Sequence, residues 1–332
     1  MKPLQKEYAI IVRSKTRLET LIERFNTKAQ TKFYIESLGG SYEFYEHEHE
    51  VFYQSLNTLQ SQLAKMIKYK IIDRSFLPSY IFNQKNIIVV IGQDGLVANT
   101  AKYSKNLPIV AVNPDPQSYD GILLPFGPED FVSGVEQVIQ GQHQAKTVNF
   151  AEVKLNDGQK LLAFNDLFIG PTSHISARYK ISFNGITEEQ SSSGIIVSTS
   201  AGATGWLSSI FNMAYGIADH FDSKPLNNKR KVPNKAKGKF DESGIKMVHH
   251  RPQLSKNELL FAVREPFKSI RTQTDLVAGI INQQNQLTIE SLMPNQGIIF
   301  SDGVEKDFIK FNSGAIATVG LSKDSAQLVK HS

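Results

Sequence analysis

The stretch Ile87-Ile88-Val89-Val90-Ile91-Gly92-Gln93-Asp94-Gly95 joins an unbroken apolar run to an acidic turn between two glycines. Continuous runs of β-branched residues are typical of parallel strands that are buried on both faces. In open α/β sheets, ligands bind at the carboxyl ends of such strands. The stretch therefore predicts a buried parallel strand that leads into a ligand site.

Asp94 is the residue of this turn that can do chemistry. The neighbouring glycines let a ligand approach the backbone, so the aspartate is a candidate catalytic base. Backbone N–H groups in the turn and the start of the following helix would attract an anion. The alternative is that Asp94 only caps a helix that begins near Val97. The segment alone leaves both interpretations open.

The composition narrows the classes of protein and ligand. The chain has 332 residues, which is long enough for two domains, and its 37 basic against 32 acidic residues give a net charge of +5. This mild excess favours an anionic ligand such as a nucleotide, and the dispersed lysines predict no nucleic-acid binding. The absence of cysteine excludes disulfides and cysteine nucleophiles and fits a reducing compartment. With no membrane span and no secretory leader expected, we predict a cytoplasmic protein without membrane contact.

The first part of the chain alternates between strand-like and helix-like patterns. Strands are predicted at Tyr8–Val12, at the opening stretch and at Pro108–Val112, and helical spacing at Arg17–Phe25 and Glu43–Tyr69. Strands that alternate with helices indicate a layered α/β domain with a parallel sheet. We expect this domain to cover residues 1–145.

From about Val148 the pattern changes to short alternating runs separated by turn signals such as Asn184-Gly185 and Asp302-Gly303. This predicts a mostly antiparallel, β-rich, sandwich-like domain over residues 146–304. Residues of about 305–332 are expected to pack back on the N-terminal domain.

Two segments of the β-rich part combine strands with polar groups. Asn165-Asp166 interrupts the apolar run Phe164–Ile169, and a buried polar pair is costly unless both residues find partners. Their donors and acceptors suit a ribose or a base edge, and the alternative is an edge-strand pair or a bulge. In Ser198–Ser209, small hydroxylated residues precede an apolar helical pattern from Trp206, which indicates either nucleotide binding or a Ser/Thr-rich helix cap.

Other charged segments are weaker candidates. Glu46-His47-Glu48-His49-Glu50 does not place its alternate residues on one helix face, so we expect a solvated charged face. His249-His250 lacks a partner pattern, and the basic residues of Lys229–Lys239 lie among loop formers. No metal-ligating set, Walker A loop or Rossmann glycine fingerprint is found in the sequence.

The order of the three main segments resembles that of the NAD kinase family. Its usual forms are Gly-Gly-Asp-Gly-Thr, Asn-Glu and Thr-Gly-Ser-Thr-Ala-Tyr, in this order and at comparable spacing. The pattern is most similar to the mitochondrial-type branch, on the segments Val112–Pro116, Asn165–Gly170, Ser191–Gly194 and Arg264–Phe267. Gln93 stands in place of the second glycine and Leu96 in place of the threonine.

The resemblance implies an N-terminal α/β domain, a C-terminal β domain and an active site in the crevice between them. It implies ATP-dependent phosphorylation of the adenosine-ribose 2′-hydroxyl of NAD, with Mg²⁺, with Asp94 as the catalytic residue, and with ATP or polyphosphate as donor. A homodimer or homotetramer is also expected. The nucleotide-binding residues that it implies are Gly92, Gln93, Gly95, Asn113, Asn165, Asp166, Thr204, Gly205, Trp206 and Ser209.

Two other hypotheses remain open from the sequence. One is a related kinase that phosphorylates a lipid or a sugar, since lipid kinases share a similar glycine-aspartate turn. The other is a nucleotide-binding protein with little catalysis, which the residues at Gln93 and Leu96 suggest. An ATP-dependent NAD kinase is the leading hypothesis.

Overall fold

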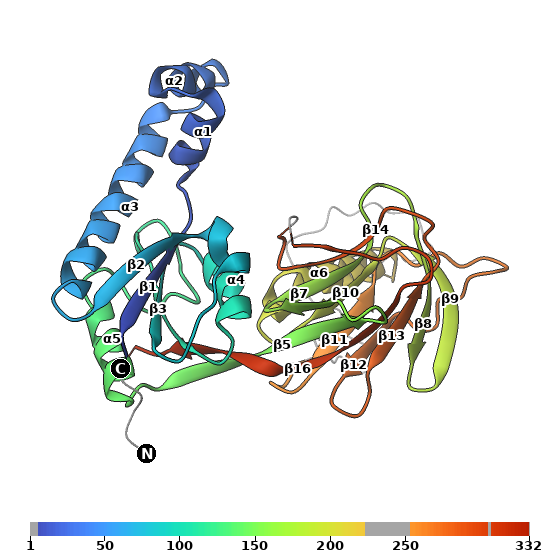
Figure 1. The fold of residues 1–332 in the computed structure, drawn as a ribbon. Coiled ribbons are helices and arrows are strands. Elements are labelled where there is room, and N and C mark those ends of the chain that lie inside the picture. Colours follow the sequence, from blue (N-terminus) through green and yellow to red (C-terminus); the bar gives the residue numbers. More distant parts are fainter. Residues whose placement is uncertain (1–5, 223–252, 305–306, 332) are drawn as a thin grey trace, which may run out of the picture. The chain divides into compact units, whose positions relative to one another are not determined.

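The computed structural model describes residues 6–222, 253–304 and 307–331 (Figure 1). The chain forms two compact units. The first comprises Met1–Phe150, Leu162–Phe164 and Ser322–Ser332, and the second comprises Ala151–Leu161 and Asn165–Leu321.

The first unit is built on a parallel sheet with the strand order β2-β1-β3-β4-β16. Its strands are β1 (Tyr8–Arg13), β2 (Lys68–Asp73), β3 (Asn86–Ile91), β4 (Pro108–Val112) and the end of β16 (Ile316–Val329). Every residue of β3 and β4 is buried, which confirms the parallel strand predicted from the opening stretch. The chain passes from β1 to β2 toward one edge of the sheet, and then from β3 to β4 in the opposite direction. The strand order therefore reverses between β1 and β3. This is a topological switch point, where open α/β sheets bind ligands.

Helices complete the first unit: α1 (Arg17–Phe25), α2 (Lys28–Ser37), α3 (Tyr42–Leu63), the 3₁₀ helix η1 (Arg74–Ser79), α4 (Asp94–Ser104) and α5 (Phe131–Gln140). Apolar residues of α3 and α5 share one core with β1, β3 and β4. By contrast, α1, α2 and the start of α3 form an arm that stands away from the sheet of this unit and has a small core of its own (Figure 1).

Two helix predictions in the first unit were incomplete. The helix expected over Glu43–Tyr69 ends at Leu63, and Lys68–Asp73 is a strand. The apolar pattern continues past the helix because Met66, Ile67 and Tyr69 pack on the same core. Helix α2 was not predicted, and its Phe33 is exposed rather than part of a buried stripe.

The second unit is dominated by antiparallel pairing, as predicted. One sheet has the order β12-β11-β10-β7-β14-β15, with β7 at Asp166–Pro171, β10 at Ile195–Ser198, β11 at Leu259–Val263, β12 at Ala278–Ile281, β14 at Gly297–Ser301 and β15 at Ile309–Lys310. The other strands are β5 (Ala145–Leu155), β6 (Lys160–Ala163), β8 (Ala177–Phe183), β9 (Ile186–Ser192), β13 (Leu287–Ser291) and the first part of β16.

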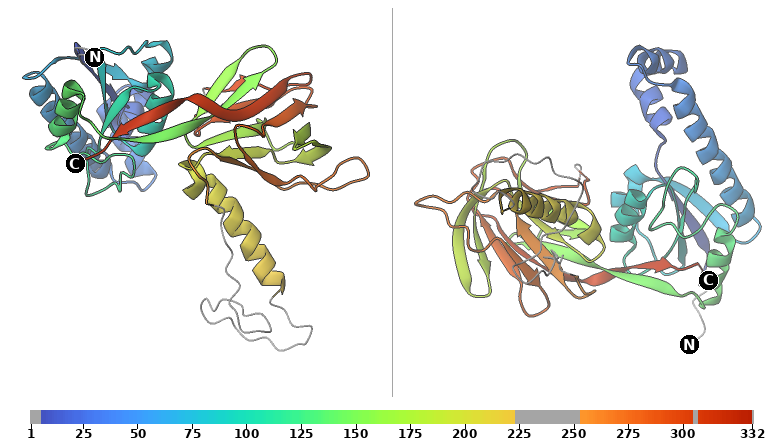
Figure 2. Two further views of the ribbon diagram at one scale, coloured as in Figure 1. Left: turned by 90° about the horizontal axis from the view of Figure 1, so that it is seen from below. Right: turned by 180° about the vertical axis from the view of Figure 1, so that it is seen from behind.

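Helix α6 (Trp206–Asp222) projects from the strands of the second unit (Figure 2). It follows the short 3₁₀ helix η2 (Gly202–Thr204), so the predicted apolar helical pattern at Trp206 is confirmed. Across the described ranges, the structure contains no helix with the length and apolarity that spanning a bilayer demands.

Candidate functional site

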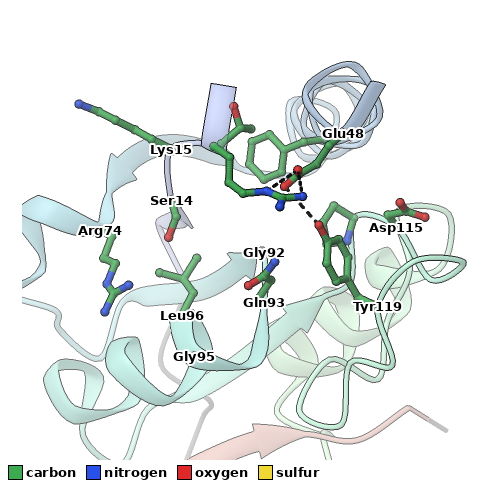
Figure 3. A pocket seen from close by; sticks show the side chains of 14 residues that line it. Ser14, Lys15, Glu48, Arg74, Gly92, Gln93, Gly95, Leu96, Asp115 and Tyr119 are labelled. Atoms are coloured by element: carbon green, nitrogen blue, oxygen red, sulfur yellow. Dashed lines mark hydrogen bonds and ion pairs between the residues drawn. The ribbon is translucent and has the colours of Figure 1, made fainter. Parts of the chain in front are cut away.

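A cavity of about 320 Å³ lies within the first unit, at the carboxyl ends of the four strands β1 to β4 (Figure 3). The lining residues Ser14–Arg17 follow β1, and Arg74 follows β2. Gly92, Gln93, Gly95 and Leu96 follow β3, and Pro114 and Asp115 follow β4. Parallel strands bring their carboxyl ends to one edge, so residues distant in sequence meet there. This is the place and the size expected of a small-molecule site.

The turn Gly92–Gly95, called here the glycine turn, uses its two glycines differently. Gly92 has φ +154°, and a Cβ atom there would come within 3.0 Å of Leu96 Cδ2. At Gly95 a Cβ atom would meet nothing within 4 Å. The internal packing of the chain therefore explains the glycine at position 92, and the space at position 95 is open to a ligand.

Gln93 is the N-cap residue of α4, but its side chain makes no capping hydrogen bond. It is exposed and lines the cavity. Its φ of −105° is available to any residue, so the backbone tolerates a side chain here in place of the family's glycine. The Gln93 amide is thus placed to contact whatever occupies the cavity.

Asp94 is the first residue of α4 rather than its cap, so the capping interpretation is wrong. Its Oδ1 accepts a hydrogen bond of 2.8 Å from the Leu123 backbone N–H. Within the described residues, Oδ2 takes part in no hydrogen bond. Asp94 is half-buried and borders the cavity through its neighbours Gln93 and Gly95, which line it. A carboxylate that is held by one oxygen can accept a proton through the other.

A charged network lines part of the cavity. Arg17 Nε donates to Glu48 Oε2 at 2.7 Å, and Tyr119 Oη donates to Glu48 Oε1 at 3.2 Å (Figure 3). The bond to Glu48 raises the pKa of Arg17, and burial followed by the Glu48 charge raises the pKa of Tyr119. The network joins α1, α3 and the segment after β4. It keeps a permanent cation beside the glycine turn.

Two residues of the run Glu46–Glu50 belong to this region, so the expectation of a purely solvated face is wrong for them. Besides the Glu48 contacts, His49 Nδ1 lies 2.9 Å from Thr16 Oγ1. Among the residues with described placement, no group of three or more His, Asp or Glu side chains could hold a metal ion.

Asn113 is buried, and both ends of its amide are used inside the segment that follows β4. Nδ2 donates to the Tyr119 carbonyl at 2.8 Å, and Oδ1 accepts from the Asp115 N–H at 3.1 Å. Asn113 therefore shapes the segment that carries Tyr119 and Leu123. Its direct contact with a nucleotide stays a prediction.

In the second unit, Asn165, Asp166, Thr199, Gly202 and Asp302 form a second group, called here the polar cluster. The Thr199 N–H donates to the Asn165 carbonyl at 2.9 Å. A Cβ atom on Gly202 would lie 2.4 Å from the same carbonyl oxygen and 2.8 Å from Asp166 Oδ1. The predicted Asn-Asp pair and the predicted Ser/Thr-Gly run therefore pack directly against each other.

Asp166 is the electrostatically unusual member of the polar cluster. Its pKa is raised to about 6, mainly by burial; a hydrogen bond with Ser198 opposes the rise, and the charge of Asp302 adds to it. The buried Oδ1 atom has no hydrogen-bond partner among the residues that the structure describes. Unpartnered buried acceptors are rare in folded proteins, and ligand binding is one explanation for them.

The remaining predicted residues surround the start of α6. Thr204, Gly205 and Ser209 are exposed, and Trp206 is half-buried. The Trp206 ring stacks on Phe168 with a centroid distance of 5.7 Å and an interplanar angle of 12°. Arg264 lies 5.5 Å from the centroid of the Trp206 ring, within the range of a cation–π interaction.

Sequence reasoning missed Arg17, Glu48, Tyr119 and Asp302. Each of them makes its contacts with residues far away in sequence, so the periodicity of the sequence did not indicate a role for Arg17, Glu48 or Tyr119. Asp302 was noted only as a turn residue. The basic stretch Lys229–Lys239 and His249-His250 lie outside the described residues.

The chain is similar in sequence to bacterial NAD kinases. It is 26% identical to the NAD kinase of Chlorobaculum tepidum over 123 residues, which are 36% of this chain and 42% of the relative. It is 26% identical to that of Chlorobium phaeobacteroides over 167 residues, which are 48% of this chain and 54% of the relative. The chain thus spans about half the length of the curated relatives it matches. No family model matches it.

Solved structures of NAD kinases are similar over nearly the whole chain. Yeast NADH kinase in complex with NADH has a TM-score of 0.52 at 14% identity, with 99% of this chain and 84% of that chain covered. An NAD kinase from Archaeoglobus fulgidus in complex with ATP has a TM-score of 0.50 at 14% identity, with coverages of 97% and 93%. The parallel α/β unit and the antiparallel β-rich unit therefore make up the fold of NAD kinases.

Proposed function

We propose that the protein is an NAD kinase, which transfers the γ-phosphoryl group of ATP to the adenosine-ribose 2′-hydroxyl of NAD or NADH. The observation that carries the proposal is Asp94, which lies at the carboxyl end of β3 beside the switch point, with Oδ1 anchored to Leu123 and Oδ2 open. The sequence likeness to bacterial NAD kinases supports the choice of substrate.

In this reaction, the 2′-oxygen attacks the γ-phosphorus while the bond from that phosphorus to the β,γ-bridging oxygen breaks, and ADP leaves. Asp94 Oδ2 receives the proton of the hydroxyl as the new phosphate ester forms. The protein contributes mainly position and charge, as phosphoryl transfer requires.

Anion binding in the first unit would come from the glycine turn and the start of α4. The open space at Gly95 lets phosphate oxygens approach backbone N–H groups, and the helix dipole favours negative charge there. Lys15, Arg17 and Arg74 supply positive charge around the same cavity. Gln93 adds an amide where the family has a glycine.

We assign magnesium to the substrate, MgATP. The described residues offer no set of three or more acidic or histidine ligands, which fits an ion that is held by phosphate oxygens and water with few protein ligands. Magnesium would neutralise the charge that develops on the phosphates.

Nucleoside recognition is assigned to the second unit. Asn165 and Asp166 would bind the ribose or a base edge, and Thr204, Gly205, Trp206 and Ser209 would line the nucleotide at the start of α6. We further propose the mitochondrial-type branch, a homodimer or homotetramer, and a cytoplasmic location.

An acceptor screen tests the proposed function. Purified protein is incubated with γ-labelled ATP, Mg²⁺ and one acceptor at a time: NAD, NADH, NAD that lacks the adenosine 2′-hydroxyl, a sphingoid base, diacylglycerol or a hexose. We expect label transfer to NAD or NADH and none to the deoxy analogue. Transfer to a lipid or sugar alone would overturn the proposal, and so would tight NAD binding without any transfer.

A further inference from the structure

Asp302 lies in the turn immediately after β14, in the second unit. Its φ is +54° and that of the following Gly303 is +67°, so both residues adopt left-handed backbone conformations. Aspartate tolerates this region better than most residues, but glycine would occupy it without cost. The conformation alone therefore does not explain why an acidic side chain is present.

The hydrogen bonds of the Asp302 side chain to the Asn165-Asp166 pair explain why the residue is acidic. Its Oδ1 accepts hydrogen bonds from the backbone N–H of Asn165, at 2.6 Å, and of Asp166, at 3.3 Å. In the opposite direction, the Asp302 N–H donates to the Asp166 carbonyl at 2.9 Å. Asp302 thus makes three hydrogen bonds to the same dipeptide: it accepts two through Oδ1 and donates one through its N–H.

The Asn165 carbonyl links the dipeptide that Asp302 binds to the rest of the polar cluster. That oxygen accepts from the Thr199 N–H, and Gly202 packs against it so closely that a Cβ atom would lie at 2.4 Å. Any movement of the Asn165 backbone must therefore move the turn that leads into η2 and α6. Both nucleotide-binding segments of the second unit depend on one dipeptide.

We propose that Asp302 is a positioning residue for nucleotide binding, which fixes Asn165-Asp166 and, through it, the turn Thr199–Gly202. The inference rests on the proposed function for the identity of the ligand, NAD. Its structural part, the grip on the dipeptide, stands independently of that function.

The charge of Asp302 adds a second effect on Asp166. The groups that act on the Asp166 carboxyl are Ser198 from β10, through a hydrogen bond, and Asp302 from the end of β14, through its charge. The Thr199 hydroxyl is already used, because it accepts from the N–H groups of Ala201 and Gly202. Removing the Asp302 charge should therefore lower the pKa of Asp166.

Three variants separate these effects. Asp302→Gly keeps the left-handed backbone and removes the acceptor. Asp302→Asn keeps an Oδ1 acceptor and removes the charge. Asn184→Gly is the matched control, because Asn184 has φ +51° before Gly185 in the turn between β8 and β9.

The readouts are NAD affinity by calorimetry and amide hydrogen exchange of the segment that contains Asn165 and Asp166. For Asp302→Gly we expect affinity to fall by about tenfold or more, with faster exchange in that segment, because a hydrogen bond to a charged acceptor is lost. Asp302→Asn should keep an affinity near that of the wild type and move the acid limb of the pH profile of NAD binding to lower pH. Asn184→Gly should change neither readout.

Asp302→Gly with affinity within about twofold of the wild type and unchanged exchange would overturn the inference. An equal loss of affinity in Asn184→Gly would also overturn it, because the effect would then be a general one on turns. If the wild type binds no NAD, the proposed function fails, and the exchange measurement alone decides the role of Asp302.

Discussion

The glycine turn and the polar cluster are built in opposite ways. In the glycine turn, a Cβ atom on Gly95 would meet nothing within 4 Å, and Asp94 is held by one oxygen only. In the polar cluster, Gly202 is pressed against the Asn165 carbonyl, and Asp302 binds the backbone on both sides of it. The glycine turn leaves space for a ligand. The polar cluster is held in place by contacts within the protein before any ligand binds.

This difference fits the two tasks of the proposed reaction. Phosphates vary in position as a bond is made and broken, whereas a nucleoside is recognised by a fixed set of donors and acceptors. We therefore expect substitutions in the glycine turn to change the reaction with little change in stability. Substitutions in the polar cluster should change both.

Asp94→Asn should have the largest effect on the reaction. The amide keeps an oxygen that can accept from the Leu123 N–H but cannot take the proton of the substrate, so kcat should fall by about 10²–10⁴-fold. The free energy of unfolding, measured with urea, should change by less than about 0.5 kcal/mol. A large loss of stability would mean that Asp94 is mainly structural.

Gly202→Ala and Gly95→Ala form a matched pair across the two regions. At Gly202 the new methyl group would collide with backbone, so the free energy of unfolding should fall by about 3 kcal/mol. At Gly95, near the start of α4, alanine should leave stability unchanged or raise it by up to about 1 kcal/mol, while the KM for ATP rises. Equal effects of the two substitutions on stability would remove the contrast between the regions.

Asp166→Asn should raise the stability of the protein and weaken its binding of the nucleotide. In the native state the pKa of Asp166 is about 6, above its ordinary value of 3.8, so the native state binds the proton more tightly than the unfolded state. This contribution to stability is fully present below the ordinary pKa and is lost as the pH rises through about 6. The asparagine variant should therefore be about 3 kcal/mol more stable at pH 7 and bind NAD more weakly.

The check is urea denaturation of both proteins between pH 4 and pH 8. The difference in unfolding free energy between them should grow as the pH rises through about 6 and then level off. A difference that does not depend on pH would show that Asp166 does not titrate in this range.

Glu48→Gln should have the smallest effect. It removes the charge that pairs with Arg17 and leaves an amide that can still bond to Tyr119. The freed guanidinium should bind phosphate more strongly, and the KM for ATP should fall by a few-fold, since half-exposed ion pairs are worth only about 0.2–1 kcal/mol. A rise in KM would instead indicate that Glu48 itself serves the substrate.

The sequence predicted the glycine turn because its signals are local. Five consecutive β-branched residues before Gly92 identify a buried strand, and the polar turn must follow at its carboxyl end. The apolar helix from Trp206 was predicted for the same reason. Local signals also located Asn165-Asp166, because a polar pair inside an apolar run stands out.

The other residues of the two regions depend on contacts that no local pattern reveals. Glu48 reaches Arg17 and Tyr119 only because α3 packs beside the cavity, and Asp302 meets Asn165 only because β14 pairs with β7. In a single sequence, these residues resemble any other surface charge. The turn signal at Asp302-Gly303 correctly predicted a turn. The contact of the Asp302 side chain with Asn165 could be recognised only from the structure, because Asn165 lies far away in sequence, next to the strand that pairs with β14.

The most direct test of the central claim is NADP formation by the purified protein from NAD and MgATP, with the phosphate located on the product by phosphorus NMR. We predict a product phosphorylated at the adenosine 2′ position, formed in proportion to the protein and lost in Asp94→Asn. No NADP from protein that binds both NAD and ATP, or undiminished formation by the folded Asp94→Asn variant, would contradict the account.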